Sequence, residues 1–214
     1  MRHWTSKDYK TMPWKNGGGS TTELAIFPEG ANLDHFVWRL STASVAQAGP
    51  FSYFSGIDRS LAILTGDGLM LKKDPGVISE SASEEINILD RTSAPHRFRG
   101  EETYYAELMS GAVLDLNLMT RRDVCQHYMQ RLYAGEHFVR AEDAQQILIY
   151  CAQGRALLDA GVSLVAQDLL LMDEEHEHGG IELRLKVEEE SVVYLMRISF
   201  LNHADQGGAP YALG

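Results

Sequence analysis

The chain has 214 residues, of which 44% are hydrophobic and 23% are charged, a composition typical of a globular protein with a sizeable core. Its formal net charge of −11 argues against a nucleic-acid partner, because binding to phosphate backbones relies on clustered lysine and arginine. No apolar run reaches about 18 residues, the length that a membrane-spanning helix requires, so we expect no membrane partner.

The first ten residues and the cysteines bear on location and redox state. Residues 1–10 are charged and polar where an export signal needs an apolar stretch, which favours a cytoplasmic protein. Cys125 and Cys151 are too few for a disulfide framework, so we expect two reduced thiols. Although His127 follows Cys125 by two residues, a partly buried thiol is favoured over a catalytic pair.

The first motif along the chain is the run Met-Pro-Trp-Lys-Asn-Gly-Gly-Gly-Ser-Thr-Thr-Glu at residues 12–23. Three consecutive glycines are entropically costly to order, so a compact domain accepts them where the backbone takes positive φ or lies close against another group. The flanking cation, amide, hydroxyls and carboxylate are recognition groups. A flexible loop is the alternative. The run lacks the preceding strand and the following Lys-Ser/Thr of a phosphate-binding loop.

Short apolar runs separated by turn residues follow, a pattern typical of an all-β sandwich or barrel. We expect strands at residues 36–41, 61–64, 69–72, 86–89, 113–119, 147–151, 156–159, 164–172, 181–187 and 192–200. The polar segment 131–145 is expected to be a loop or a short helix, and residues 202–214 a frayed tail.

Two parts of the chain repeat the same order of elements. Residues 61–71 predict strand, glycine turn and strand, and residues 147–158 predict the same. Each unit is followed by a second hairpin whose last strand ends in a Leu-Met pair, at residues 118–119 and 195–196. We interpret this as an internal duplication of a barrel, joined near residues 120–127.

Polar residues occupy one face of two predicted strands. Period-2 alternation separates Arg39 and Ser41 from their apolar neighbours, and it separates Asp115 and Asn117 from three leucines. The polar face either meets water or lines a barrel cavity, where its groups need a ligand or mutual pairing. Arg59 either forms a simple ion pair or faces the same cavity, where its planar fork suits a carboxylate, as does that of Arg39.

Two further pairs of residues have two interpretations each. Arg121 and Arg122 would form a second anion clamp or a solvated turn pair. Trp14 and Trp38 would either line a cavity or pack in the core, and core packing is favoured.

Histidines are placed poorly for a metal. A metal site in a β-barrel enzyme often combines a His-x-His pair, a nearby glutamate and a third histidine. His96 has no second histidine close to it in the sequence. His176 and His178 lie in an acidic, glycine-ended turn that no glutamate and third histidine follow at that spacing. We therefore expect neither a metal nor another cofactor.

Four motifs resemble one known family. They are Trp-Lys-Asn-Gly-Gly-Gly-x-Thr-x-Glu at 14–23, Trp-Arg-Leu-Ser at 38–41, Phe-Ser-x-Phe-x-Gly-x-Asp-Arg at 51–59 and Asp-Leu-Asn-Leu-Met-Thr-Arg at 115–121. They resemble the HutD/Ves family, small bacterial bicupin-like proteins associated with histidine utilisation. The resemblance implies an all-β bicupin of two cupin-like barrels (RmlC-like jelly rolls) in one compact unit. We divide the chain into an N-terminal cupin-like barrel, 1–120, and a C-terminal cupin-like barrel with a polar tail, 121–214.

The resemblance also implies a function. Such proteins are thought to be non-catalytic governors of histidine utilisation that bind a small carboxylate such as N-formylglutamate. A metal-dependent cupin enzyme, an isomerase or dioxygenase, is the alternative, and an interaction protein whose barrels scaffold a homodimer is a third reading. The expected ligand-binding residues are Lys15, Asn16, Gly17, Gly18, Thr21, Glu23, Trp38, Arg39, Ser41, Arg59, Asp115, Asn117 and Arg121.

Overall fold

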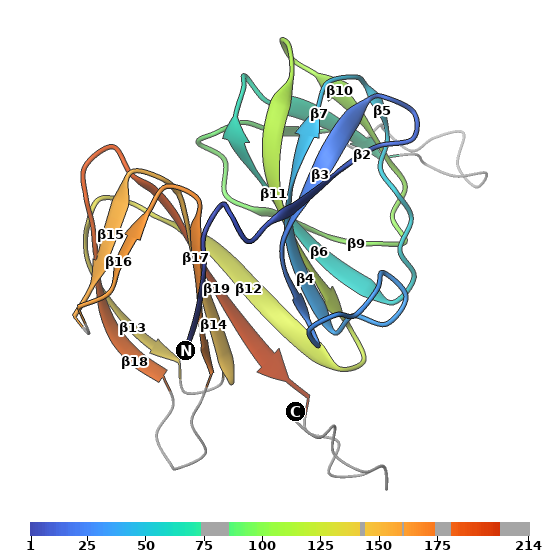
Figure 1. Ribbon diagram of the computed structural model, residues 1–214. Helices are drawn as coiled ribbons and strands as arrows, with labels where there is room; N and C mark the ends of the chain where they lie inside the picture. Colours follow the sequence, from blue (N-terminus) through green and yellow to red (C-terminus); the bar gives the residue numbers. More distant parts are fainter. Residues whose placement is uncertain (74–85, 142–143, 160, 174–180, 202–214) are drawn as a thin grey trace, which may run out of the picture.

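The computed structural model describes residues 1–73, 86–141, 144–159, 161–173 and 181–201 (Figure 1). These residues form strands, turns and loops, and none of them is in an α-helix. The strands build two barrels that lie side by side, each made of a larger and a smaller sheet (Figure 1). The all-β prediction is confirmed.

The first barrel consists of a six-stranded and a four-stranded antiparallel sheet. The six-stranded sheet has the order β2 (Lys10–Pro13), β3 (Gly19–Phe27), β4 (Trp38–Val45), β11 (Val113–Arg121), β6 (Ile57–Thr65) and β9 (His96–Arg99). The four-stranded sheet has the order β5 (Gly49–Pro50), β10 (Tyr104–Leu108), β7 (Leu69–Lys73) and β8 (Ile86–Leu89).

The second barrel has a five-stranded and a four-stranded sheet. The former has the order β1 (Arg2–Trp4), β17 (Asp168–Asp173), β14 (Gln146–Gln153), β19 (Val192–Phe200) and β12 (Cys125–Leu132). The latter has the order β13 (Gly135–Ala141), β18 (Ile181–Val187), β15 (Arg155–Leu158) and β16 (Ser163–Val165). Because β1 pairs with β17, the first residues of the chain lie on the second barrel (Figure 1). The division at residue 120 stays a prediction.

The sheet orders confirm the internal duplication. The order β4-β11-β6-β9 in the first barrel matches β12-β19-β14-β17 in the second, and β5-β10-β7-β8 matches β13-β18-β15-β16. The two Leu-Met pairs are not equivalent, however. Leu118 packs between the barrels, whereas Leu195 packs inside the second barrel. An offset of one residue along a strand moves a side chain to the opposite face of its sheet.

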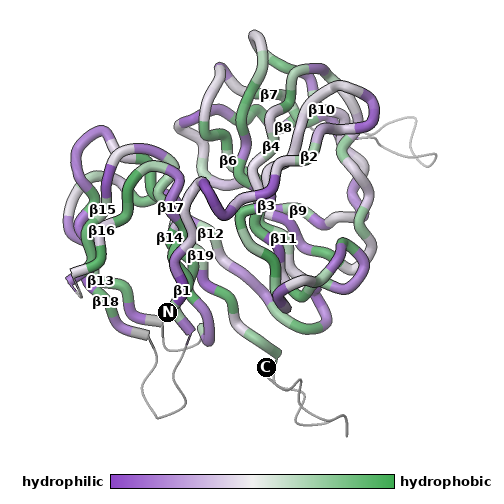
Figure 2. Tube along the Cα trace, in the orientation of Figure 1, coloured by the Kyte–Doolittle hydropathy of each residue, from purple (hydrophilic) through white to green (hydrophobic). Residues whose placement is uncertain are grey.

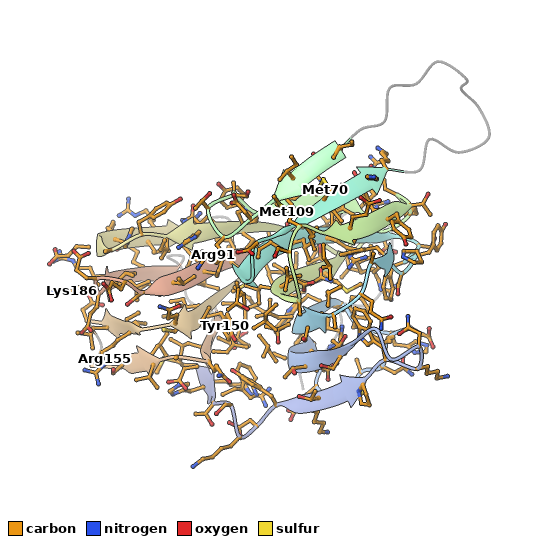
Figure 3. The ribbon with its side chains drawn as sticks, turned by 90° about the horizontal axis from the view of Figure 1, so that it is seen from above. Met70, Arg91, Met109, Tyr150, Arg155 and Lys186 are labelled. Atoms are coloured by element: carbon orange, nitrogen blue, oxygen red, sulfur yellow. The ribbon has the colours of Figure 1, made fainter. Side chains whose placement is uncertain are left out.

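The two larger sheets pack against each other through their apolar faces. Leu40 and Leu116 of the first barrel share one hydrophobic cluster with Tyr150 and Met196 of the second. In Figure 3, Tyr150 lies between the two halves of the molecule. The apolar residues predicted on β4 and β11 therefore form the barrel–barrel interface, and the polar residues of the same strands face the interior of the first barrel.

The interiors of the two barrels differ in chemistry. Apolar side chains fill the second barrel, among them Ile147, Ile149, Leu170 and Leu185. The hydropathy tube shows the corresponding hydrophobic runs of β14 and β17 (Figure 2). In the first barrel, a separate apolar cluster around Leu61 and its neighbours fills only part of the interior. The remaining part is the polar cavity described below.

Several element predictions need correction. Residues 131–145 contain the strand β13, not a helix, and its Glu136 and Arg140 lie opposite Lys186 and Glu182 on β18. The single strand predicted at 164–172 is two strands, β16 and β17, separated by Gln167 with a φ of 72°. The strands β1, β2, β3, β5, β9, β10 and β12 were not predicted either. The segments 174–180 and 202–214, with the histidine turn and the predicted tail, lie outside the described residues.

Candidate ligand-binding cavity

A cavity of about 550 Å³ lies in the first barrel. Its walls come from β4, β6 and β11, from the loop between β2 and β3, and from the chain around β5. This volume is in the range of small-molecule sites.

Two arginines form one row across the floor of the cavity. Met119 on β11 lies directly opposite Arg39 on β4 and opposite Arg59 on β6. Residues directly opposite each other project from the same face of a sheet, so all three side chains line the cavity. With neighbouring strands about 4.8 Å apart, the two arginine backbones are separated by roughly 10 Å.

The next two rows carry shorter polar side chains. Asn117 is opposite Ser41, and Asp115 is opposite Ala43. All four residues line the cavity. The floor therefore changes along β11 from guanidinium groups, through an amide and a hydroxyl, to a carboxyl group.

Arg39 is buried and has a protein partner. Its Nε donates a 2.8 Å hydrogen bond to Oε2 of Glu23, and its Nη1 donates a 3.4 Å bond to Oγ of Ser41. The Glu23 carboxylate thus neutralises this guanidinium and fixes its orientation.

Arg59 is held differently. Its side chain is enclosed by three aromatic rings, with the guanidinium carbon 5.2 Å from the ring centre of Phe51, 5.6 Å from that of Phe54 and 4.8 Å from that of Phe98. Its Nη1 donates a 3.2 Å bond to the carbonyl oxygen of Ser52. Burial lowers the pKa of Arg59 to about 10, so the group is charged at neutral pH. Within the described part of the chain, its Nε has no acceptor and no carboxylate forms an ion pair with it.

Asp115 and Asn117 are buried, at 2% and 9% exposure. Neither the Oδ1 of Asp115 nor the Oδ1 of Asn117 has a hydrogen-bond partner among the described residues. Burial raises the pKa of Asp115 to about 7, against the opposing effect of the Arg59 charge. Unpartnered buried polar groups are costly to a fold, and binding sites are where natural proteins tolerate them.

The glycine run forms the hairpin loop between β2 and β3, at the mouth of the cavity. Gly17 adopts a φ of 73°, a conformation that favours glycine. A Cβ on Gly19 would lie 2.2 Å from the carbonyl oxygen of Ser44, so only glycine fits there. The amide of Gly18 donates a 3.1 Å bond to Oδ1 of Asn16. Both reasons proposed from the sequence for this run, positive φ and close approach, are therefore present.

The structure brings most of the predicted site residues together. Those lining the cavity are Lys15, Asn16, Gly18, Thr21, Arg39, Ser41, Arg59, Asp115 and Asn117.

Four predicted residues lie outside the cavity lining. Gly17 shapes the loop, and Glu23 acts through its bond to Arg39. Trp38 is on the opposite face of β4, in the core between the barrels. Arg121 is turned away, because its guanidinium donates to the carbonyl oxygens of Phe36 and Asp34.

Other cavity residues were missed by the alternation argument. Phe51, Ser52 and Phe54 line the cavity from a segment without regular secondary structure, although they belong to a motif quoted above. Trp14 lines the cavity too, and its Nε1 donates a 2.8 Å bond to Oγ1 of Thr21. Trp38 packs in the core, as expected, whereas Trp14 packs against the apolar cluster of the first barrel and also lines the cavity.

His127 does not activate Cys125. Its two ring nitrogens lie 2.8 Å from Oγ of Ser60 and 2.6 Å from Oγ1 of Thr120. Burial lowers the pKa of His127 to about 4 and raises the pKa of the Cys125 thiol to about 12. A buried neutral thiol is a poor nucleophile. Both cysteines are free and buried, as predicted.

The remaining candidates are accounted for by protein contacts. Arg122 donates to Asp58 at 2.6 Å and to Glu101 at 2.9 Å, so it is not free to form an anion clamp with Arg121. Among the described residues, no three His, Cys, Asp or Glu side chains are grouped as metal ligands would be. The ring of His96 packs against Phe98.

A second hollow, of about 540 Å³, lies on the second barrel and is lined by residues of β13, β15 and β18. Its polar residues, such as Glu136, Arg184 and Lys186, are exposed. Figure 3 shows Lys186 and Arg155 at the outer end of this barrel. We favour the cavity of the first barrel as the site, because its charged residues Arg39, Arg59 and Asp115 are buried.

Among the residues that the structure describes, no helix has the length and apolar character needed to cross a membrane.

Comparisons with known proteins agree with this fold. The sequence profile of the HutD family matches residues 6–195. An uncharacterized 21.2 kDa protein in the hutC 3′ region of Pseudomonas putida is 38% identical over 114 residues, 53% of this chain and 55% of that protein. Protein Ves of Citrobacter koseri is 37% identical over 125 residues, 55% of this chain and 58% of that protein. This chain thus matches little more than half the length of these two curated relatives.

Solved structures cover more of the chain. HutD from Pseudomonas fluorescens SBW25 superposes with a TM-score of 0.76 at 28% identity, covering 94% of this chain and 98% of that one. Oxalate decarboxylase from Lactobacillus farciminis gives a TM-score of 0.61 at 6% identity, covering 92% of this chain and 85% of that one, which shows a shared cupin-type fold alone.

Proposed function

Because this chain belongs to the HutD family, whose profile matches residues 6–195, we propose that it serves histidine utilisation as a ligand-binding protein. Its ligand is a small carboxylate held in the cavity of the first barrel. The names of two similar proteins, HutD and a protein in the hutC 3′ region, support this pathway. The protein acts as a governor that responds to its ligand without converting it, and N-formylglutamate is the first compound to test.

The observation that carries the proposal is the state of Arg59. This guanidinium is buried, charged and wrapped by three phenylalanine rings, yet no carboxylate of the described residues pairs with it. A buried charge without a partner is strongly unfavourable, and a ligand carboxylate supplies the missing partner through a bidentate pair. Arg39, Lys15 and Asn16 line the same cavity and add further donors.

The test is a thermal-shift and calorimetric screen with N-formylglutamate, urocanate, histidine and glutamate. A ligand at about a hundred times its dissociation constant stabilises the fold by roughly 2.7 kcal/mol. For a chain of this size, that corresponds to a rise in Tm of about 5 to 10 °C.

Two variants, each replacing an arginine by methionine, distinguish a loss of ligand binding from a general effect of removing one positive charge. Arg59→Met should abolish the ligand-induced shift, because it removes the carboxylate partner. Arg184→Met, on the exposed outer face of the second barrel, should leave the shift unchanged. The proposal fails if no carboxylate raises the Tm, or if both variants respond to ligand as the wild type does.

A further inference from the structure

The cavity of the first barrel contains two opposite charges that do not pair with each other. Arg59 and Asp115 both line it, and no ion pair joins them. Along β11, Asp115 lies two rows from Met119, the residue opposite Arg59. At about 3.3 Å per residue, those rows are roughly 13 Å apart along the strand. Both side chains line the same cavity of about 550 Å³, which has room for a small molecule.

The unpartnered atoms on the floor of the cavity are of two kinds. Among the described residues, the Nε of Arg59 is a donor without an acceptor, whereas Oδ1 of Asp115 and Oδ1 of Asn117 are acceptors without a donor. Asp115 and Asn117 occupy alternate positions on β11, so both side chains project from the same face of the sheet into the cavity. The complementary ligand therefore presents an acceptor at one end and at least two hydrogens at the other.

The other charges near the cavity do not supply those hydrogens. Glu23 already neutralises Arg39 at 2.8 Å, and Lys15 stands at the mouth, on the loop between β2 and β3. A ligand with carboxylates alone would satisfy Arg59 but would leave both acceptors unpaired and set a second negative charge beside Asp115. An N-acylated amino acid offers only one N–H and adds a carbonyl group that needs a donor of its own.

Building on the carboxylate-binding function above, we propose that the ligand is a free amino acid. Its carboxylate binds Arg59, and its ammonium group donates to Asp115 and Asn117. Asp115 and Asn117 are thus the residues that select for the amino group.

This selection can be tested with matched compounds that differ only in the group carried by the α-carbon: a free amino group, an acylated nitrogen or no nitrogen. Glutamate is compared with N-formylglutamate and with glutarate, and histidine with imidazole propionate, by calorimetry on the full chain at pH 7.5. In any series that binds, the free amino acid should bind at least tenfold more tightly than the compound that lacks nitrogen at that carbon.

Two variants assign the preference to Asp115. Asp115→Asn keeps the shape of the side chain and removes its charge, so the preference for the amino compound should fall below threefold while binding of the deamino compound persists. Asp115→Leu is a second variant that should fold, because Leu195 occupies the corresponding position in the second barrel, opposite Ile149 as Asp115 is opposite Ile63.

The outcomes separate the two proposals. If glutarate or N-formylglutamate binds as tightly as glutamate, or if Asp115→Asn keeps the full preference, the amino-acid inference is wrong and carboxylate binding stands. If none of these carboxylates binds, the carboxylate-binding function falls, and this inference falls with it.

Discussion

The indole nitrogen of Trp38, in the first barrel, donates a 2.6 Å hydrogen bond to Oε1 of Gln146, in the second. Gln146 in turn donates a 2.7 Å bond from Nε2 to Oδ1 of Asp173. Trp38 is 1% exposed and belongs to the hydrophobic cluster between the larger sheets. A polar link is thus enclosed in an apolar interface, where a lost partner cannot be replaced by water.

We predict that Trp38→Phe destabilises the chain by about 1 to 3 kcal/mol beyond the loss of packing, because Oε1 of Gln146 is left without its donor. Urea denaturation monitored by circular dichroism measures the change. Trp14→Phe is the matched control, since it removes a bond to Thr21 at the partly exposed cavity mouth and should cost less. Equal costs for the two variants would contradict the prediction.

The glycine loop allows a second prediction, on stability. Gly19→Ala should cost more than about 2 kcal/mol, because its Cβ would meet the backbone oxygen of Ser44 at 2.2 Å and force β3 from β4. Gly17→Ala meets no atom within 4 Å and should cost only about 1 kcal/mol, from its φ of 73°.

Gly17→Asn refines that comparison, because asparagine tolerates positive φ better than alanine. It should be milder than Gly17→Ala when the three variants are compared by thermal unfolding. If Gly19→Ala proves the mildest of the three, the close approach to Ser44 does not constrain the loop.

Much of the fold could be predicted from sequence because period-2 alternation is local. Arg39, Ser41, Asp115 and Asn117 were assigned to one face correctly, since the spacing of alternate residues fixes the face whatever the strand packs against. Alternation cannot say what each face meets. The leucines of β11 cover the other barrel, a contact that exists only in three dimensions.

The strands and site residues that the sequence analysis missed lack period-2 alternation of apolar and polar residues. β3 begins with glycine, serine and threonines, so its strand is stabilised by pairing with β2 and β4 and not by an apolar pattern. The rings around Arg59 come from an irregular segment and from β9. Arg121 continues the β11 motif, but its contacts with the carbonyl oxygens of residues 34 and 36 depend on the tertiary structure.

His127 gives a prediction for acid stability. Burial and the nearby Arg97 charge lower the pKa of His127 to about 4, with Asp58 opposing them. The unfolded chain binds a proton near pH 6.5, whereas the folded chain binds it only near pH 4. The contribution of neutral His127 to the free energy of unfolding is therefore fully present above pH 6.5. It is lost as the pH drops from 6.5 to 4, by up to about 3 kcal/mol.

The variant His127→Gln isolates that contribution, because glutamine does not titrate and can still bond Ser60 or Thr120. Between pH 6.5 and 4 its free energy of unfolding should fall less than that of the wild type, as urea titrations at several pH values measure. Parallel pH profiles for the two proteins would show that His127 does not contribute.

Asp115 should show the opposite pH dependence in the ligand-free protein. Burial raises its pKa to about 7, so between pH 4 and pH 7 the folded chain keeps a proton that the unfolded chain has released. Stability from this group is present at low pH and is lost as the pH rises to 7. At pH 8 the Asp115→Asn variant should therefore be more stable than the wild type, by up to about 4 kcal/mol, and at pH 4 the two should be nearly equal.

Urea denaturation at both pH values gives the comparison, with Asp159→Asn on the exposed rim of the second barrel as the control. A less stable Asp115→Asn at pH 8 would mean that the carboxylate is stabilised by the protein and is not held ready for a ligand.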